Sequence, residues 1–527
     1  MMMMTLLFIF SSLTSISAEM GTSKVCNRWC AKNQWPWTDK CTWADCAGCN
    51  QCKPPIEDQY PHDFMKCDGQ VAIQTKCMTA EGYDSISSSI QTLYNKLPTE
   101  CNEDFCPQAD WAGCVLRMAG HDFMDFDGQK GGADGCVNFG DLDNKGLKEC
   151  LYFGEHNVSL HEAYKQYCTE VSLADFLVIA AETVMSVSRS RAKREPKSID
   201  FKGQFRFGRK TATECVFNPP LPNPEDSCDG LQLTFINRMG LDWKETAALS
   251  GVHTLGRAQT ENSGYAGFWS DPNNSRIFNN NYYVSMVAKG WMPKKIQYPN
   301  RNIGAEVTSK FDHFQDCGKD NSNGCTKVQW ARSDSMGKHL DGPEMMLNTD
   351  LCLMYKNGHM EPLKASRDEC CAWAHASRGY QKQLKMSFEK YFEPIYDDAD
   401  QQWCGSSVRI GTNQIHKNCC AGVTWENAGN CVKDRVKGGE IDYGVPCHEM
   451  PLRMNGPAEK DIIRFAANET AWLEAFLIAW KKATEVGQVA QLNELGGGGC
   501  PGRKLLYAPA DGQSWNGNRG PAESVLV

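Results

Sequence analysis

The chain has 527 residues, 27 cysteines and a formal net charge of −9. This length is enough for a sizeable core and for two or three domains. An acidic surface repels phosphate backbones, so the charge argues against a nucleic-acid-binding protein. Beyond residue 20 no apolar run is long enough to cross a bilayer, which argues against a transmembrane segment.

Residues 1–18 are predicted to be a signal peptide. Residues 6–10 form a short apolar block, and the small residues Ser15, Ser17 and Ala18 follow it at a suitable cleavage site. No lysine or arginine precedes the block, which departs from the usual pattern. The many clustered cysteines fit an oxidising compartment. Glycosylation triplets lie at Asn157, Asn273 and Asn468. We therefore expect a protein that is secreted or held in the secretory-pathway lumen.

Residues 19–82 are predicted to form a cysteine- and tryptophan-rich module. Six cysteines and four tryptophans fall within residues 26–52, without helical or strand periodicity. A small disulfide-stapled module is the favoured interpretation in a secretory context. A zinc site is the alternative, because Cys46, Cys49 and Cys52 have ligand-like spacing.

Helical patterns dominate residues 83–350. Residues 172–184 are apolar on most faces, which predicts a buried helix. Residues 231–239 and 243–255 are predicted to be two helices separated by a turn, with Asp242 as the N-cap of the second. Strand patterns are scarce.

The C-terminal third changes character twice. Residues 365–455 place cysteines among Gly, Asn and Asp, which predicts a loop-rich, disulfide-bonded insertion. A helical pattern resumes over residues 458–485. Residues 491–527 contain four consecutive glycines and little periodicity, so we expect a flexible tail.

Three apolar segments contain charged or titratable side chains that could have a chemical role. Arg117 and His121 are four residues apart and would share one face of a helix, although a solvated helix edge is an alternative. His253 lies within an apolar helical segment, where a single histidine is more often an ordinary core residue. Asp350 follows Thr349 in an apolar stretch, and a buried carboxylate needs a partner.

In this order the three segments resemble the plant, fungal and bacterial haem peroxidase superfamily. The proximal pattern Ser-Gly-x-His-Thr-x-Gly matches residues 250–256, and the distal Arg and His match Arg117 and His121. Further matching segments are 131–135, 144–147, 174–175 with Glu182, and 208–209. The resemblance implies a mainly α-helical, two-lobed haem peroxidase domain, which we place at residues 83–490.

The resemblance also implies roles for single residues. His253 would bind the iron of haem b, and Asp350 would accept the other ring N–H. His121 would move a proton of hydrogen peroxide to the leaving oxygen, while Arg117 stabilises the developing negative charge. Asn144 resembles the residue that holds the distal histidine in its working tautomer.

Residues 262–269 resemble the class that contains cytochrome c peroxidase and ascorbate peroxidase. Trp269 would then lie beside the proximal histidine and donate its indole N–H to Asp350, although a packing role is the alternative. Ascorbate peroxidases carry an arginine where this chain has Asn262, so ascorbate is not the expected donor. Asp110 lacks the companion carboxylates of a manganese site, because Cys114 and Gln259 stand there.

Two further features concern the distal side and possible cations. Gly120 stands where the family has Trp or Phe beside the distal histidine, which would open space over the haem. Several residues of this chain match the distal calcium ligands of secreted peroxidases, and their oxygen atoms suit calcium. Cys136, however, stands where those peroxidases have a serine ligand. The calcium or other cation candidates are Asp122, Gly132 and Asp134 on the distal side and Thr254 and Asp271 on the proximal side.

The sequence therefore predicts a secreted haem peroxidase that reduces hydrogen peroxide to water. Its electron donor is either a small organic molecule or a redox protein. The alternative is a secreted cysteine-rich binding or matrix protein on a degenerate peroxidase fold. Gly120 and the tryptophan-rich module favour that alternative, whereas the intact set Arg117, His121, His253 and Asp350 favours the enzyme.

Overall fold

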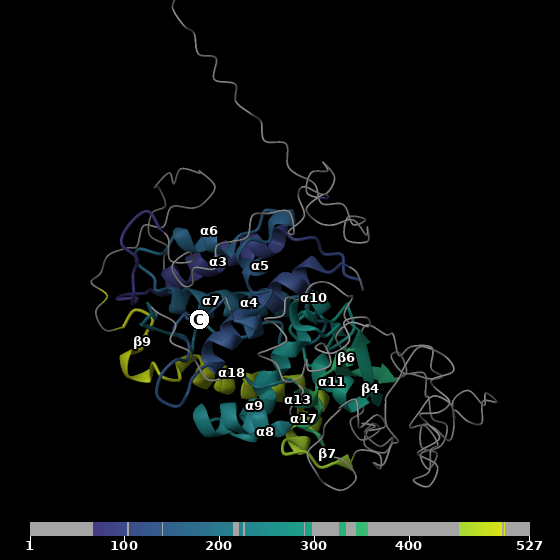
Figure 1. Ribbon diagram of the computed structural model, residues 1–527. Helices are drawn as coiled ribbons and strands as arrows, with labels where there is room; N and C mark the ends of the chain where they lie inside the picture. The colour runs from purple at the N-terminus through teal and green to yellow at the C-terminus, as the bar shows by residue number, and fades with distance from the viewer. Residues whose placement is uncertain are drawn as a thin grey trace, which may run out of the picture. The chain divides into compact units, whose positions relative to one another are not determined.

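A computed structural model (Figure 1) places the part of the chain that carries the site. The described residues are Lys40, 67–297 except 103–104, 140, 214–220, 225–226 and 289, then 326–333, 344–356, and 453–500 except 498–499. The predicted signal peptide and most of the N-terminal module lie outside them, as do residues 365–452 of the insertion and 501–527 of the tail. Among the described residues, no helix is long and apolar enough to span a membrane.

The prediction of a mainly α-helical fold is confirmed. One group of packed helices contains α3 (Ala80–Lys96), α4 (Pro107–Met124), α5 (Lys148–Leu151), α6 (Leu160–Lys165) and α7 (Leu173–Arg189). Helix α7 is the predicted buried helix, and Ser172 caps it by accepting a hydrogen bond from the Asp175 N–H. Nearly every α7 side chain is buried, so this helix forms the centre of the group.

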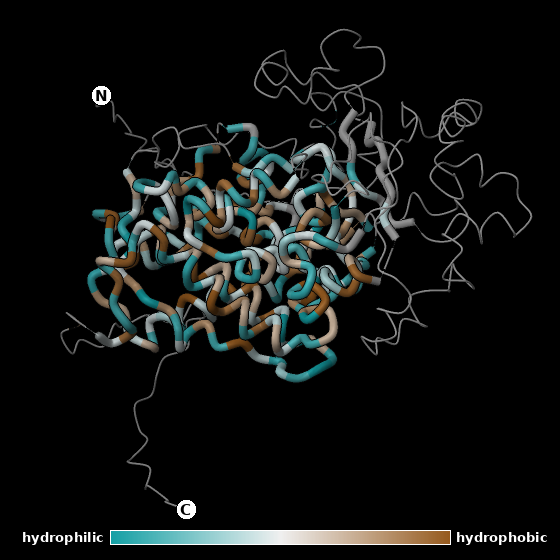
Figure 2. The backbone as a smooth tube through the Cα atoms, turned by 90° about the horizontal axis from the view of Figure 1, so that it is seen from below, coloured by the Kyte–Doolittle hydropathy of each residue, from teal (hydrophilic) through white to brown (hydrophobic). Residues whose placement is uncertain are grey.

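A second group contains α9 (Trp243–Ser250), α11 (Asn281–Ala288), α17 (Glu459–Ala467) and α18 (Glu469–Glu485). Residues 458–485, predicted to be helical, form α17 and α18 with a break at Asn468. The Asn468 side chain accepts from the Ala471 N–H and so caps α18. Helix α18 contacts both α9 and α4, which joins the two groups. Figure 2 shows hydrophobic and hydrophilic stretches alternating along the described backbone.

The segment before the proximal histidine differs from the expected pair of regular helices. Residues 228–238 form α8 (Cys228–Leu231) and the π-helix η4 (Gln232–Arg238). Asp242 caps α9 as predicted, in a reciprocal capping box with Glu245. The helix then tightens into the 3₁₀ turn η5 (Gly251–Thr254), so His253 lies on a 3₁₀ turn rather than within an α-helix.

Strands are short, except for one hairpin that the sequence did not predict. Strand β4 (Gly290–Gln297) pairs antiparallel with β5 (Thr326–Ser333), and β5 pairs with β6 (Met345–Met346). The other pairs are β1 (Arg206–Phe207) with β9 (Asn493–Glu494), β2 (Arg257–Ala258) with β3 (Gly267–Phe268), and β7 (Tyr355–Lys356) with β8 (Arg453–Met454). Short helical turns complete the described elements: η2 (Leu142–Asn144), η3 (Gly154–His156), α10 (Thr260–Ser263), α13 (Asn348–Leu351) and η10 (Val489–Gln491).

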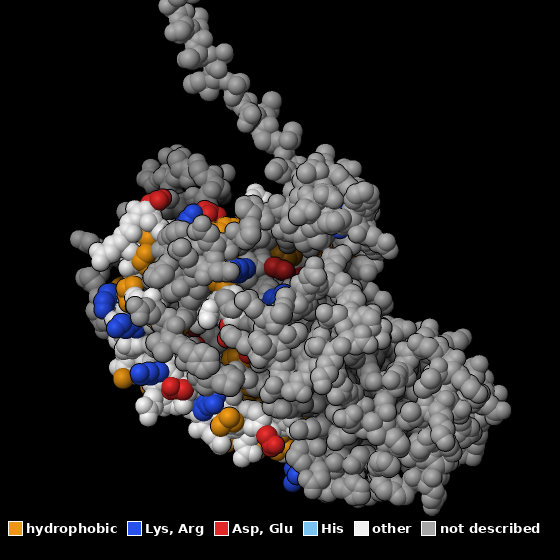
Figure 3. Space-filling view, viewed as in Figure 1, with side chains coloured by type: hydrophobic (Ala, Val, Ile, Leu, Met, Phe, Trp, Pro, Cys, Tyr) orange, Lys and Arg blue, Asp and Glu red, His pale blue; other side chains and the backbone are white. Residues whose placement is uncertain are grey.

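Disulfides fix both edges of the helical domain. Cys67 is bonded to Cys168 and Cys77 to Cys500, so residues 67–79 and the start of the expected tail belong to this domain. Its edges therefore lie outside the expected 83–490. Further disulfides join Cys101 to Cys106, Cys114 to Cys150, and Cys228 to Cys352. On the face drawn in Figure 3, charged side chains of both signs are interspersed with apolar ones over the described residues.

Candidate functional site

The distal side is built on the C-terminal half of α4 and the turn η2. His121 and Arg117 share one face of α4, and Arg117 Nε lies 3.3 Å from His121 Nε2. His121 Nδ1 lies 2.8 Å from the amide oxygen of Asn144, whose Nδ2 donates to the Asn138 carbonyl at 2.8 Å. Because that amide presents its oxygen to the ring, Nδ1 carries the proton and Nε2 is the acceptor, which receives the hydrogen bond from Arg117 Nε.

The electrostatics of the distal pair suit a proton acceptor. Burial and the neighbouring charge of Arg117 lower the pKa of His121 to about 3. His121 is therefore neutral at ordinary pH. Burial also lowers the pKa of Arg117 to about 10, which still leaves the guanidinium charged at neutrality. Arg117 is held in place by the carbonyls of Asp143 and Lys145, next to Asn144.

The proximal side is organised by one buried carboxylate. Asp350, on α13, is 1% exposed and accepts four hydrogen bonds. Its Oδ1 accepts from His253 Nδ1 and from the Tyr282 hydroxyl, each at 2.8 Å. Its Oδ2 accepts from Trp269 Nε1 at 2.8 Å and from the Leu347 N–H at 2.7 Å. The indole of Trp269 stacks on His253 with ring centroids 4.4 Å apart. The arrangement expected for His253, Asp350 and Trp269 is therefore present.

The distal and proximal segments meet at a contact between two glycines. A Cβ on Gly113, one turn before Arg117, would lie 2.8 Å from the Gly256 Cα, three residues after His253. Only glycines allow this approach, since real Cβ atoms do not come so close to backbone. The 3₁₀ turn leaves 36% of the His253 side chain accessible, although Asp350 behind it is buried.

The side chains of the proximal and distal sides fit a bound haem. The Nδ1 edge of His253 is fixed by a carboxylate, so Nε2 remains as the ligand atom, and a carboxylate partner raises the basicity of such a ligand. At Gly120 a Cβ would meet only the ends of Met124 and Phe123, at 3.9 and 4.0 Å. Within 4 Å, a Cβ at Gly120 would therefore meet no backbone of another element.

Sequence reasoning missed Tyr282 and the partner of Asp110. Tyr282 is fully buried, and burial together with Asp350 raises the pKa of its hydroxyl, so it stays protonated and donates. In the sequence, Tyr282 is simply the first of two adjacent tyrosines, and no local pattern indicates its hydrogen bond to Asp350. Asp110 forms a two-pronged ion pair with Arg257, at 2.7 and 2.9 Å. The Asp110 carboxylate is therefore held in place by Arg257.

The cation candidates lie in two polar regions, one at the C-terminal end of α4 and one after η5. Both Asp122 oxygens accept backbone N–H groups, from Gly135 and Cys136. Burial and the nearby charge of Asp134 raise the pKa of Asp122 well above its usual range, and burial raises the pKa of Asp134 to about 6. Gly132 donates its N–H to Asp125 in the same turn. Across the described residues, no group of three or more His, Cys, Asp or Glu side chains is arranged to bind a metal ion.

On the proximal side, Thr254 donates to the Asn279 amide oxygen at 3.0 Å. Asp271 accepts from the Asn273 and Asn274 N–H groups and from the Asn281 side chain. These oxygens stabilise the turn that follows Trp269.

Comparison with known proteins gives a family match and several relatives. The family model described as Peroxidase matches residues 88–364. The chain is 34% identical over 193 residues to L-ascorbate peroxidase 5, peroxisomal, of Arabidopsis thaliana, which covers 35% of this chain and 61% of that protein. It is 27% identical to L-ascorbate peroxidase 2, cytosolic, of Oryza sativa subsp. japonica, over 40% of this chain and 78% of that protein.

A third relative is the mitochondrial cytochrome c peroxidase of Emericella nidulans, 26% identical over 45% of this chain and 62% of that protein. The chain thus spans about three fifths of the length of the Arabidopsis and Emericella relatives.

Proposed function

The chain belongs to the peroxidase family, and from this premise we propose that it is a haem enzyme that reduces hydrogen peroxide to water with electrons from a separate donor. One observation carries the proposal. Two imidazoles, His121 and His253, each use Nδ1 in a hydrogen bond to a fixed oxygen, which makes Nε2 the accepting nitrogen of each ring. On His121 this nitrogen accepts from Arg117 Nε at 3.3 Å. The partner of Nδ1 is a neutral amide on one side and a carboxylate on the other, which suits a base and an iron ligand respectively.

The roles follow from these partners. His253 would hold the haem iron through Nε2, and the bound haem would supply the centre that receives peroxide and stores its oxidising equivalents. His121 Nε2 takes a proton from the peroxide oxygen nearest to it and returns it to the departing oxygen. Arg117 stabilises the negative charge on that oxygen. Asn144 keeps the His121 proton on Nδ1, so the accepting nitrogen always faces the peroxide.

The test is the absorption spectrum of the haem-loaded ferric protein before and after one equivalent of hydrogen peroxide. We expect rapid conversion of the Soret band, because the distal pair is complete. A haem spectrum that peroxide leaves unchanged would contradict the peroxidase proposal and implicate Gly120. Failure to bind haem would favour a binding or matrix protein instead.

The pH dependence of the peroxide reaction is a further prediction. A protonated His121 cannot accept a proton, so the rate is expected to fall as the pH drops through about 3. Above this limb the rate is expected to stay flat through neutral pH, where Arg117 keeps its charge. Stopped-flow rates across the range measure this, and an acidic limb near the ordinary histidine pKa of 6.5 would contradict the lowered value.

The donor is proposed to be a molecule other than ascorbate, although two of the relatives are named for it. Asn262 Nδ2 lies 3.5 Å from Glu149 Oε2 and 3.3 Å from Gln259 Oε1. A carboxylate next to this amide disfavours an anionic donor at that position. Michaelis kinetics with ascorbate test the point, since saturation at low concentration would argue against it.

Secretion and calcium complete the proposal. Five disulfides between described cysteines support folding in an oxidising compartment. The repulsion between Asp122 and Asp134 supports a distal calcium ion, because a divalent cation would relieve it. Elemental analysis of protein purified from culture medium tests both, and intracellular retention or the absence of calcium would contradict them.

A further inference from the structure

One face of α4 is joined to a single segment of the chain at four levels. This segment, residues 138–150, is called the distal segment below, and all of it except residue 140 is described. Four side chains of α4, spaced three and four residues apart, make the contacts: Trp111 with the Cys150 carbonyl, Cys114 with Cys150 through a disulfide, Arg117 with the Asp143 and Lys145 carbonyls, and His121 with Asn144. The disulfide is the covalent link of the four.

Backbone hydrogen bonds within the distal segment are local. The N–H groups of Asn144, Leu147 and Glu149 each donate to the carbonyl three residues earlier. Such turns shape the segment, but they do not fix its distance from another helix. Short turns of this kind belong to the parts of a protein that open at low free energy. The contacts with α4 therefore decide how precisely the segment is placed.

Resting on the peroxidase function, we propose that the disulfide between Cys114 and Cys150 is a positioning element of the distal pair. It holds the distal segment against α4, so that the oxygen atoms of the segment stay on Arg117 and His121. Cys114 lies three residues before Arg117, and Cys150 is fully buried. The two cysteine Cα atoms are 5.7 Å apart. A disulfide spans only a narrow range of Cα separations, so the segment cannot leave the helix at this point.

The distal chemistry depends on where the oxygens of this segment lie. The Asn144 amide oxygen lies 2.8 Å from His121 Nδ1 and sets the tautomer of the ring. Two backbone carbonyls of the segment orient the Arg117 guanidinium. Burial lowers the pKa of Arg117 to about 10, and the charges of Asp143 and Glu149 counteract this lowering. A misplacement of about 1 Å in a reacting group can cost about 10²-fold in rate, so loss of the disulfide is expected to slow the peroxide reaction.

The experiment uses the haem-loaded full chain with Cys114→Ala and Cys150→Ala together. Stopped-flow absorbance at the Soret band measures the reaction with hydrogen peroxide, and we expect a rate about 10²-fold below the native one. The affinity of the ferric protein for fluoride should fall about 10-fold, because a bound anion loses the charged donor Arg117. The iron–histidine stretching band of the ferrous protein should not move, because His253 and Asp350 are untouched.

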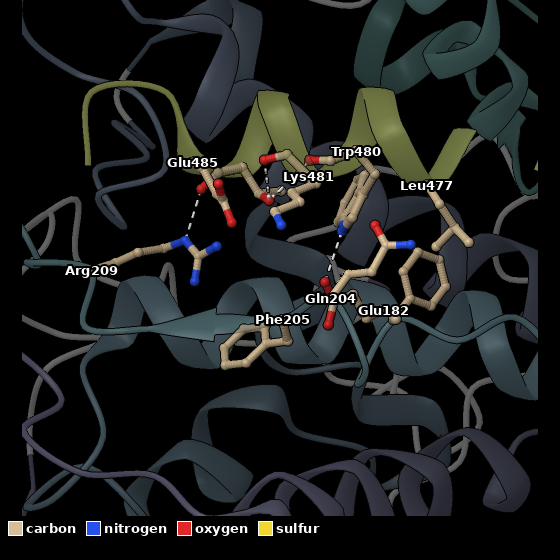
Figure 4. Close-up of a pocket in the computed structure, with 10 residues that line it drawn as sticks. Glu182, Gln204, Phe205, Arg209, Leu477, Trp480, Lys481 and Glu485 are labelled. Atoms are coloured by element: carbon tan, nitrogen blue, oxygen red, sulfur yellow. Dashed lines mark hydrogen bonds between the residues drawn. The ribbon is translucent and has the colours of Figure 1, made fainter. Parts of the chain in front are cut away.

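Two controls separate positioning from general stability. Cys67→Ala with Cys168→Ala removes a disulfide that is likewise made of one partly buried and one fully buried cysteine, outside the distal segment. Glu182→Gln weakens the core elsewhere: Glu182 accepts from the Trp480 indole at 2.9 Å, and Figure 4 shows that indole directed at it. Both controls should unfold at a lower temperature while the peroxide rate and the fluoride affinity stay native.

A double-mutant cycle with Asn144→Ala tests whether the disulfide acts through the distal segment. Asn144→Ala alone should slow the peroxide reaction, because the His121 tautomer is no longer fixed. In that background the loss of the disulfide should cost only about 10-fold, since both changes remove the same contact. If the two penalties multiply in full, the disulfide does not act through Asn144 and the positioning role is overturned.

The remaining outcomes separate this inference from the peroxidase function. Cys114→Ser breaks the same bond and leaves the buried Cys150 in place, so it replaces the double variant if that protein binds no haem. If the native chain reacts rapidly and the disulfide variant reacts at the native rate, the positioning role is wrong and the peroxidase function stands. A rate loss of equal size in the Cys67 and Cys168 control would also overturn it. If peroxide shifts no band in the native chain, both proposals fail.

Discussion

Replacing His121 by leucine is expected to slow the reaction of the haem-loaded protein with hydrogen peroxide by about 10²–10⁴-fold, the usual contribution of a positioned general base. The Nε2 acceptor disappears, and no described neighbour replaces it, because Arg117 carries only donors and the Asn144 oxygen points to the other ring nitrogen. Stopped-flow absorbance at the Soret band measures the rate.

The matched control for this variant is His156→Leu. His156 lies on η3 and packs against Phe105 and Phe153 outside the distal pair. It should leave the rate unchanged. Haem content should stay the same in both variants, because His253 is untouched. A His121→Leu protein that reacts with peroxide at the native rate would remove His121 from the mechanism.

Replacing Asp350 by asparagine is expected to weaken haem binding and destabilise the fold together. Each carboxylate oxygen of Asp350 accepts from two donors, but an amide has only one oxygen. One pair of donors therefore faces an NH₂ group instead of an acceptor. The buried donors on that side then lose their acceptor, which costs about 1–3 kcal/mol for each. Loss of the carboxylate also lowers the basicity of His253, and such partners typically change metal affinity or activity by about 10–100-fold. Haem titration and thermal unfolding measure the two effects.

The control for this variant is Asp84→Asn. Asp84 pairs with Lys202 on the surface, and both side chains are well exposed. Exposed pairs contribute about 0–1 kcal/mol, so unfolding should shift little and haem affinity not at all. If Asp350→Asn behaved like this control, the carboxylate would not organise the proximal side.

The distal and proximal sets were within reach of the sequence. Arg117 and His121 share a helical face at a spacing of four residues, whereas His253, Asp350 and Trp269 were assigned from the resemblance of their segments to the peroxidase superfamily. Tyr282 was not predictable from such patterns, because its hydrogen bond to Asp350 spans 68 residues and depends on tertiary packing. Glu182 matched the family pattern in the sequence, but its hydrogen bonds to Tyr83 and Trp480 could not be predicted. These two donors lie 99 and 298 residues away along the chain, so the contacts depend on tertiary packing.

Parts of the fold were missed for physical reasons as well. Strand β4 contains Pro293 and two lysines, so its sequence lacks the alternation typical of a strand, and only its long pairing with β5 identifies it. The tightening of the helix before His253 follows from tertiary contacts. A Cβ on Gly251 would lie 2.5 Å from the Tyr283 hydroxyl, so the chain is pressed against α11 at that point.

The pairing of β7 with β8 bears on how this protein could have acquired its extra length. Tyr355 is opposite Met454 and Lys356 opposite Arg453, so these two points of the chain lie side by side in the domain. Residues 357–452 are therefore an insertion between two neighbouring strands of the domain. A tight turn could bridge the same two strands, since closing a loop costs only slowly more entropy as it lengthens. Such a junction lets evolution exchange, enlarge or delete a module without moving the residues around the two histidines.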